Sequence, residues 1–295
     1  EEAMTQWQIN LREASLPLHE ALALRVPTAP TAFLRQLCKK QRVTICEHPV
    51  EASRLTRVDE TITVKSSQRW LECIEKLPVK PEQILYEDPD CIVLNKPAGL
   101  AIHRAVGHED NLLHRVQDFL SLRKENFQVS PVHRLDIGTS GAVLFGKGRA
   151  AISKLGQMLI AGQFSKSYLA LVSGKLIESG ELDSEVPAKG KIKEALTRYN
   201  PLASTESYTL LELKLVTGRH HQIRHQLAVS GHPIVGDVRY RGELINELDR
   251  PFLHCRQLTF PRSSDERATT VNAPFPEGLT ELLVALQFAP EALEL

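Results

Sequence analysis

The segment from residue 131 to residue 149, PVHRLDIGTSGAVLFGKGR, constrains the fold of this chain more than any other segment. Residues 143–145 form a short apolar run typical of a buried strand, and residues 138–141 are of the types that turns prefer. Asp136 stands two residues before that turn region. The pattern predicts a loop that presents Asp136 at the mouth of a core strand, where a rigid scaffold can fix a reactive group. Taken alone, it also suits a surface aspartate that caps a turn or pairs with an arginine.

Composition indicates an ordinary globular protein. With 295 residues, 42% hydrophobic and 24% charged, the chain can bury one substantial core and carry a small second domain. Lys plus Arg equal Asp plus Glu at 36 each, so the net charge is zero and any nucleic acid must be bound by local patches. The sequence has no bilayer-length apolar run and no secretory-signal profile, and its five cysteines are scattered. These features predict a reduced, cytoplasmic protein without membrane contact, disulfide framework or zinc–cysteine site.

Residues 11–64 predict a small N-terminal α/β domain. Two helical patterns, LREASLPLHEALALRV and TAFLRQLCKKQRV, precede two short β-type runs. In the second helical pattern Arg35, Lys39 and Arg42 recur at spacings of four and three, which would place them on one helical face. This basic face is a candidate RNA contact, although such a stripe is more often only a solvated surface.

Residues 65–81 indicate a linker with a short helical turn, and residues 82–292 a second, larger domain. In that domain ILYEDPDCIVLNKPAGL suggests two strands, LLHRVQDFLSLR a helix, and YTLLELKLVTG an alternating strand. Strands and helices do not alternate strictly. The expected fold is therefore α+β with a mainly antiparallel, mixed sheet rather than a doubly wound parallel sheet.

Four separate segments together resemble the RluA-type family of RNA pseudouridine synthases. They are HRLDIGTSG, NKPAGLAIH at 95–103, KSYLALVSG at 166–174 and TGRHHQIRHQLAVSGHPIVGD at 217–237, in the family's order. Members break the bond between uracil N1 and the ribose, rotate the uracil and rejoin it through C5. The resemblance implies a cofactor-independent isomerase that flips a uridine out of structured RNA. The N-terminal region resembles the S4 RNA-binding module. Beside such a catalytic domain, this module favours large-subunit ribosomal RNA over transfer RNA as the partner. The enzyme is expected to be a monomer.

The resemblance implies three catalytic residues. Asp136 matches the aspartate of the HRLD motif, and a carboxylate can act as nucleophile or base only while it is ionised. Burial would raise its pKa, so a fixed positive partner is required, and Arg224 of the QIR motif fills that place. Tyr168 matches the active-site tyrosine, whose ring can stack on uracil and whose hydroxyl can relay the C5 proton. Read without the resemblance, Arg224 is an ordinary helix arginine and Tyr168 an ordinary core aromatic.

Four further residues are implied to bind substrate. Arg134 would fill the stack that the flipped uridine leaves, and so offset part of a flipping cost of about a few kcal/mol. His133 belongs to the same group, with a structural hydrogen-bonding role favoured over that of a second base. Lys166 would support the site or bind phosphate, and Ile223 would form an apolar wall against uracil. Each also suits an ordinary role in an ion pair, on the surface or in the core.

Three features favour a different class of function, a non-catalytic RNA-binding or ribosome-assembly factor. The first is the zero net charge of the chain. Ile137 follows Asp136 where the family commonly has a lysine or arginine. The S4-like turn carries Glu47, His48 and Pro49 instead of the usual asparagine, glycine and lysine. The retained catalytic set argues for the enzyme, because a binding protein would not require it.

Two other kinds of site are less well supported. His220, His221 and His225 include an i, i+4 pair, but the sequence offers no third ligand at a recognisable spacing, so no metal site is predicted. A glycosidase normally needs two carboxylates, and Asp237, the available second one, lies among glycine and proline residues that suit a structural turn.

Overall fold

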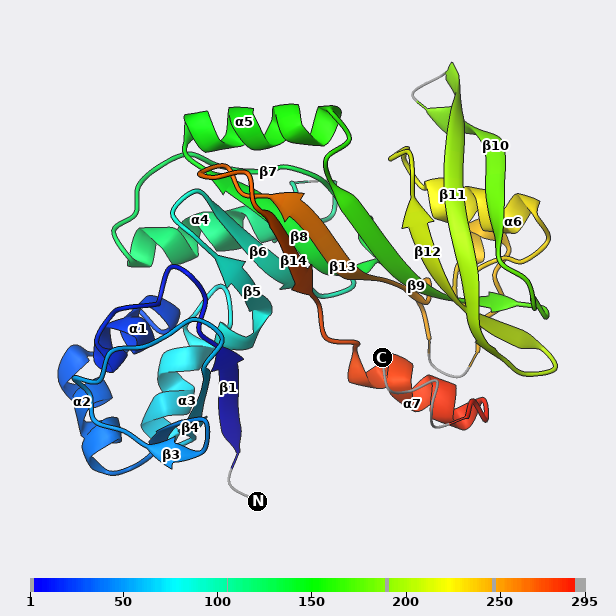
Figure 1. The fold of residues 1–295 in the computed structure, drawn as a ribbon. Helices are drawn as coiled ribbons and strands as arrows, with labels where there is room; N and C mark the ends of the chain where they lie inside the picture. The colour runs from blue at the N-terminus through cyan, green and yellow to red at the C-terminus, as the bar shows by residue number, and fades with distance from the viewer. Residues whose placement is uncertain (1–2, 105, 189–190, 246–247, 290–295) are drawn as a thin grey trace. The chain divides into compact units, whose positions relative to one another are not determined.

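A computed structural model describes residues 3–104, 106–188, 191–245 and 248–289 (Figure 1). The chain forms two compact units that interleave along the sequence. Unit 1 comprises residues 1–94, 103–133 and 144–156, and unit 2 comprises the remainder. No helix within the described residues has both the length and the apolar character needed to cross a membrane.

The N-terminal part of unit 1 is a four-stranded sheet with three helices (Figure 1). The strand order is β1-β4-β2-β3, and every neighbouring pair is antiparallel. The strands are β1 (Met4–Gln8), β2 (Val43–Ile45), β3 (His48–Pro49) and β4 (Thr61–Lys65), and the helices are α1 (Leu18–Arg25), α2 (Thr31–Lys39) and α3 (Gln68–Glu75).

Helix α2 ends earlier than its sequence pattern predicts. Lys39 is its last residue, and Gln41 has a left-handed backbone with φ of 54°, which interrupts the helix. Arg35 and Lys39 are exposed on the helix, but Arg42 lies beyond it and donates from Nη1 to the Ser66 carbonyl at 3.2 Å. The prediction that Arg42 shares their helical face is therefore wrong.

The segment from residue 65 to residue 81 contains helix α3. Ser67 caps this helix by accepting a hydrogen bond from the Trp70 amide at 3.3 Å, and Trp70 is fully buried. The Trp70 indole donates to Thr5 Oγ1 of β1 at 3.0 Å, so α3 is fastened to the N-terminal sheet. The division into residues 11–64, 65–81 and 82–292 remains a prediction, and its end at 292 falls outside the described residues.

The rest of unit 1 consists of strand pairs with two helices. Strand β5 is antiparallel to β6, and β7 is antiparallel to the second half of β8. The chain passes between the units within β6 and β8 and again within helix α5. The elements are η1 (Pro81–Gln83), β5 (Ile84–Glu87), β6 (Cys91–Lys96), α4 (Leu112–Leu122), β7 (Val129–Pro131), β8 (Ser140–Lys147) and α5 (Arg149–Ile160).

A buried ionic cluster joins α1 to the strands and helix that follow it in unit 1. Arg123 Nη1 donates to both carboxylate oxygens of Glu87 at 2.9 and 3.0 Å, and Lys147 Nζ donates to Glu87 at 2.9 Å. Arg123 Nε donates to the carbonyl of Leu24 in α1. Burial alone would raise the pKa of Glu87, but the charges of Arg123 and Lys147 hold it below its ordinary value. The buried Glu87 carboxylate therefore holds the Arg123 guanidinium in the position where it contacts α1.

We predict that Arg123→Met destabilises the protein by about 3 kcal/mol, because it leaves part of a buried carboxylate without a partner. Urea unfolding measures this loss. Arg115→Met is the matched control, since Arg115 on the same helix pairs with the exposed Asp110 and should contribute less than about 1 kcal/mol. Equal losses for the two variants would contradict the assigned role of the buried cluster.

Unit 2 is built on a sheet with the strand order β10-β11-β12-β9-β13-β8, and β14 also pairs with β13. All these pairs are antiparallel except β13 with β8. Helix α6 packs against β10 (Figure 1). The elements are β9 (Ser165–Ser173), β10 (Gly180–Ala188), β11 (Lys191–Ser204), β12 (Tyr208–Leu215), α6 (Gln222–Val229), η2 (Val238–Tyr240), β13 (Leu253–Pro261), β14 (Ala268–Asn272) and α7 (Glu277–Ala285). The predicted α+β class with a mainly antiparallel sheet is confirmed.

Strand β8 follows the Asp136 loop, and every one of its residues is buried. Gly141 lies opposite Cys255 where β8 pairs in parallel with β13, and it has a φ of 117°. A Cβ atom on Gly141 would lie 2.2 Å from the carbonyl oxygen of Cys255, so no other residue fits without moving the strands. Gly141 therefore permits β8 and β13 to approach closely next to the candidate catalytic loop.

His254, the neighbour of Cys255 in β13, is fully buried. Its Nε2 faces the Ala273 carbonyl at 3.3 Å and its Nδ1 faces Ser140 Oγ at 2.9 Å. A neutral ring satisfies both contacts by donating to the carbonyl and accepting from the hydroxyl. Burial lowers the pKa of His254 to about 4.

We predict that His254 makes stability fall as the pH drops from about 6.5 toward 4. In this window the unfolded chain binds a proton that the folded ring does not, which disfavours the folded state by about 2–3 kcal/mol. His254→Gln should reduce by that amount the difference in unfolding free energy between pH 7 and pH 4.5, measured with urea. The same pH dependence in wild type and variant would contradict this account.

Candidate active site

Asp136 lies in a tight turn at the start of β8. The Thr139 amide donates to the Asp136 carbonyl at 3.1 Å and closes the turn. The side chain of Asp136 is 17% exposed, so it is accessible but partly desolvated. The carbonyl of the next residue, Ile137, accepts hydrogen bonds from the Gly99 amide at 2.8 Å and from Lys96 Nζ at 3.0 Å. The loop after β6 therefore fixes the peptide that follows the candidate catalyst.

Lys96 holds this arrangement from within the core of unit 2. It is fully buried, and its Nζ donates to the carbonyls of Pro97, Leu100 and Ile137 at 2.9, 2.8 and 3.0 Å. Burial lowers the pKa of Lys96 to about 7, while the nearby charge of Asp136 acts in the opposite direction. This role of Lys96 was not predicted from the sequence. Its position at the end of the apolar run CIVLNK was the available signal, because a lysine there must find acceptors in the core.

Arg224 is positioned by Asp237. Arg224 Nε and Nη2 donate to the two carboxylate oxygens of Asp237 at 2.6 and 2.7 Å, and Asp237 is 1% exposed. The remaining nitrogen, Nη1, donates to Asp136 Oδ2 at 3.3 Å. Burial disfavours the charged guanidinium, but Asp237 and Asp136 together raise the pKa of Arg224 above its ordinary value.

Arg224 therefore contacts Asp136 as predicted, but its closest carboxylate partner is Asp237. The sequence interpretation of Asp237 as only a turn residue missed this bidentate pair. A buried aspartate thirteen residues after the arginine gives no periodic signal, since it is the loop after α6 that brings Asp237 back to Arg224.

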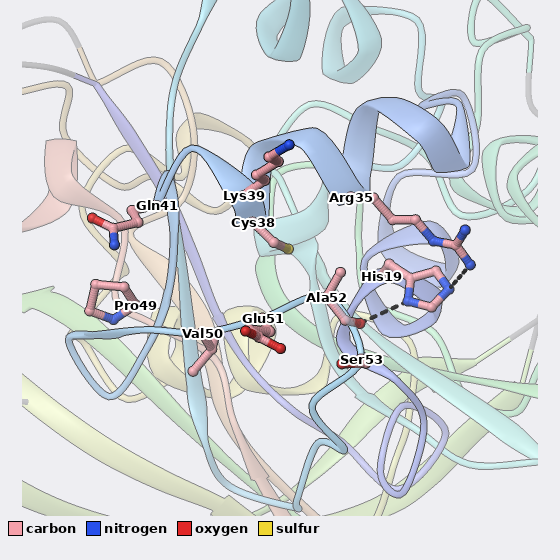
Figure 2. A pocket seen from close by; sticks show the side chains of 10 residues that line it. All are labelled: His19, Arg35, Cys38, Lys39, Gln41, Pro49, Val50, Glu51, Ala52 and Ser53. Atoms are coloured by element: carbon pink, nitrogen blue, oxygen red, sulfur yellow. Dashed lines mark hydrogen bonds between the residues drawn. The ribbon is translucent and has the colours of Figure 1, made fainter.

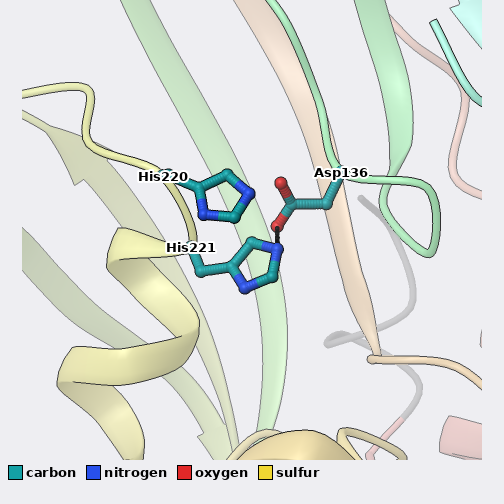
Figure 3. Close-up of side chains that lie close together, drawn as sticks. All are labelled: Asp136, His220 and His221. Carbon is teal, nitrogen blue, oxygen red and sulfur yellow. Dashed lines mark ion pairs between the residues drawn. The ribbon is translucent and has the colours of Figure 1, made fainter. Parts of the chain in front are cut away.

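His221 also contacts Asp136. Its Nε2 lies 3.5 Å from Asp136 Oδ2 and 3.2 Å from Arg224 Nη1, and its Nδ1 lies 3.1 Å from the Tyr240 hydroxyl (Figure 3). Burial lowers the pKa of His221 to about 4, although the charge of Asp136 opposes this shift. The ring is therefore neutral near pH 7, accepting from Arg224 through Nε2 and donating to Tyr240 through Nδ1–H.

Tyr168 of β9 lies opposite Cys255 of β13 and is 5% exposed. Burial raises the pKa of Tyr168 well above its ordinary value, and Cys255 and the charge of Asp136 act in the same direction. Tyr168 is thus a neutral phenol within electrostatic reach of Asp136, and can act as a donor or relay but not as a standing phenolate base.

The other predicted residues occupy varied positions. Ile223 is buried in α6, and Lys166 of β9 is half-buried with a pKa that burial lowers. Arg134 is exposed. His133 is buried, and its Nε2 accepts a hydrogen bond from the Leu144 amide at 3.2 Å, in keeping with the structural role favoured for it.

A separate cavity lies in the N-terminal part of unit 1. It has a volume of about 580 Å³ and lies between α2 and residues 49–53 (Figure 2). Arg35 and Lys39 line it, and Arg35 Nη2 lies 3.1 Å from Nε2 of His19, whose Nδ1 contacts the Ala52 carbonyl at 2.8 Å. The cavity thus places two exposed cations beside a partly apolar wall.

Comparison with known proteins identifies the family. The family described as RNA pseudouridylate synthase matches residues 90–229. The ribosomal large subunit pseudouridine synthase C of Escherichia coli (strain K12) is 30% identical to this chain, and the match covers 95% of this chain and 96% of that protein. The chain belongs to the RluA-type family of RNA pseudouridine synthases.

Other relatives of this synthase agree. The ribosomal large subunit pseudouridine synthase D of Xylella fastidiosa is 34% identical over 237 residues, covering 70% of each chain. The solved structure titled human RNA pseudouridylate synthase domain containing 4 aligns with a TM-score of 0.60 at 22% identity, covering 70% of this chain and 94% of that one, which supports the fold. The predicted family and enzyme class, an RNA pseudouridine synthase, are confirmed.

We predict that Asp237→Asn lowers kcat at least tenfold and changes KM less than threefold, because the released Arg224 no longer directs Nη1 at Asp136. Steady-state pseudouridine formation separates the two constants. Asp265→Asn is the control, since Asp265 pairs at the protein surface with Arg262 and Arg267. Unchanged kcat, or a loss confined to KM, would contradict a positioning role for Asp237.

Proposed function

We propose that this synthase converts specific uridines of large-subunit ribosomal RNA to pseudouridine, with Asp136 as the catalyst and without a cofactor. The observation that carries the proposal is the contact of Asp136 with an arginine that a second carboxylate orients. Ribosomal RNA is the favoured substrate because the relatives of this chain include ribosomal large subunit pseudouridine synthases C and D. We further propose that the enzyme acts as a monomer in the cytoplasm.

In the proposed reaction Arg134 fills the stack that the flipped uridine leaves, and uracil enters beside Tyr168 and Ile223. The N1–C1′ bond breaks and a C5–C1′ bond forms. C5 loses its proton, and N1, which is no longer bonded to the ribose, gains a proton. The product is therefore an isomer of the substrate. Asp136 acts at the ribose, at the uracil ring or on a ribose proton, and a carboxyl group serves as nucleophile or base in its carboxylate form.

Arg224 and His221 set the orientation and the electrostatic environment of the Asp136 carboxylate. Arg224 donates one directed N–H to the carboxylate, and the neutral His221 adds no competing charge. Because Asp237 already balances most of the guanidinium charge, Asp136 is held in position without being bound tightly. A loosely paired carboxylate retains lone pairs for the reaction.

We predict that Asp136→Asn abolishes turnover and leaves RNA affinity within about threefold of wild type, because the amide keeps the shape but lacks the reactive charge. Single-turnover assays on ribosomal RNA and filter binding measure the two effects. Turnover within tenfold of wild type would contradict the catalytic role and leave the RNA-binding or assembly factor as the better account.

The N-terminal cavity is the proposed second RNA contact. Arg35 and Lys39 are exposed at its wall and suit phosphate groups of a nearby strand. Arg42 remains part of the proposed surface with a smaller contribution, since its Nη1 already donates to the Ser66 carbonyl.

We predict that replacing Arg35 and Lys39 together by glutamine reduces the slope of log affinity against log salt by roughly 1.5, because two phosphate contacts are lost. The control replaces the exposed Lys124 and Lys175, which are not among the residues that line the cavity, and should retain the wild-type slope. An unchanged slope in the first variant would show that Arg35 and Lys39 only face solvent.

A further inference from the structure

Three potential metal ligands meet at the catalytic carboxylate. Asp136, His220 and His221 each offer one ligand atom, and the three atoms lie within 4.8 Å of one another (Figure 3). We propose that these side chains form a binding site for a divalent transition metal such as Zn²⁺, and that the bound ion inhibits the synthase. The inhibitory part rests on the proposed role of Asp136, whereas metal binding does not.

Two of the ligand atoms already have the required spacing. Zinc bonds of about 2.0–2.1 Å place tetrahedral ligand atoms roughly 3.4 Å apart. His221 Nε2 lies 3.5 Å from Asp136 Oδ2. The third ligand, His220, is exposed, so a side-chain rotation can bring its nitrogen closer without disturbing the core.

The backbone explains why two consecutive histidines can face one ion. Neighbours in a regular helix point in different directions. Here His221 precedes α6 with a left-handed φ of 53°, and the rings of His220 and His221 stack with centroids 3.8 Å apart and planes 22° apart. Both rings therefore lie on the side of Asp136 (Figure 3).

A second contact orients His221 for binding. Its Nδ1 lies 3.1 Å from the Tyr240 hydroxyl, which leaves Nε2 to face Asp136. A hydrogen bond at the far nitrogen is the usual way in which proteins fix the tautomer and ring direction of a ligating histidine. The i, i+4 spacing of His221 and His225 did not point to this site, because the site pairs His221 with His220 and its third ligand, Asp136, comes from a different loop.

The ion must compete with Arg224, whose Nη1 lies 3.3 Å from Asp136 Oδ2 and 3.2 Å from His221 Nε2. Binding would replace these two contacts. The guanidinium would still be compensated by its two hydrogen bonds to Asp237. We therefore expect reversible binding, weaker than in closed four-ligand sites, with an open position on the ion. An ion on Asp136 would take the lone pairs that the reaction needs.

Metal binding is tested with untagged protein freed of metal by EDTA and then of chelator. Competition with a chromogenic zinc chelator should give one Zn²⁺ ion per chain. Asp136→Asn and His220→Ala should each weaken binding at least tenfold, whereas His225→Ala, a matched histidine in α6 outside the ligand set, should change it less than twofold. The absence of binding, or wild-type affinity in Asp136→Asn, would overturn the site.

Inhibition is tested separately by pseudouridine formation. Zn²⁺ should stop turnover of the wild type, and EDTA should restore it. His220→Ala should be active in EDTA and should need at least tenfold more Zn²⁺ for inhibition. Binding without inhibition in an active enzyme would overturn the inhibitory role. If the protein forms no pseudouridine under any condition, the proposed function fails while the binding assay still decides the metal site.

Discussion

The buried pair of Arg224 and Asp237 is the interaction on which the active site depends. Two short hydrogen bonds fix the guanidinium plane, and the only nitrogen left over points at Asp136. A lone arginine would instead form its own bidentate pair with the catalytic carboxylate and hold both oxygens. The second carboxylate thus allows an arginine to orient Asp136 without neutralising it fully.

The loop that carries Asp136 is also fixed by several hydrogen bonds. Lys96 donates to three carbonyls, one of them in the residue after Asp136, and the amide of Gly99 shares that acceptor. On the strand side, Gly141 lets β8 approach β13 closely. The motifs NKPAGL and HRLDIGTSG therefore fix this loop together. The first supplies the hydrogen-bond donors to the Ile137 carbonyl, and the second supplies Asp136 and the glycine that allows β8 and β13 to pair closely.

The fold class and the meeting of Asp136 with Arg224 could be predicted from the sequence because they follow from strand patterns and from motifs whose order matches a family. The roles of Asp237, His221 and Lys96 could not, since each depends on contacts that only tertiary folding creates. Local signals also failed at Arg42, where helical spacing continues but a left-handed residue ends the helix. The S4-like module and the individual substrate contacts remain predictions.

The central claim is that this chain catalyses uridine isomerisation through Asp136. Its most direct test is a map of pseudouridine in total RNA from cells that lack the protein, compared with the same cells carrying the wild type or Asp136→Asn. The account predicts that specific ribosomal positions lose pseudouridine without the protein, regain it with the wild type and stay unmodified with the variant. An identical pseudouridine map in all three would contradict the claim.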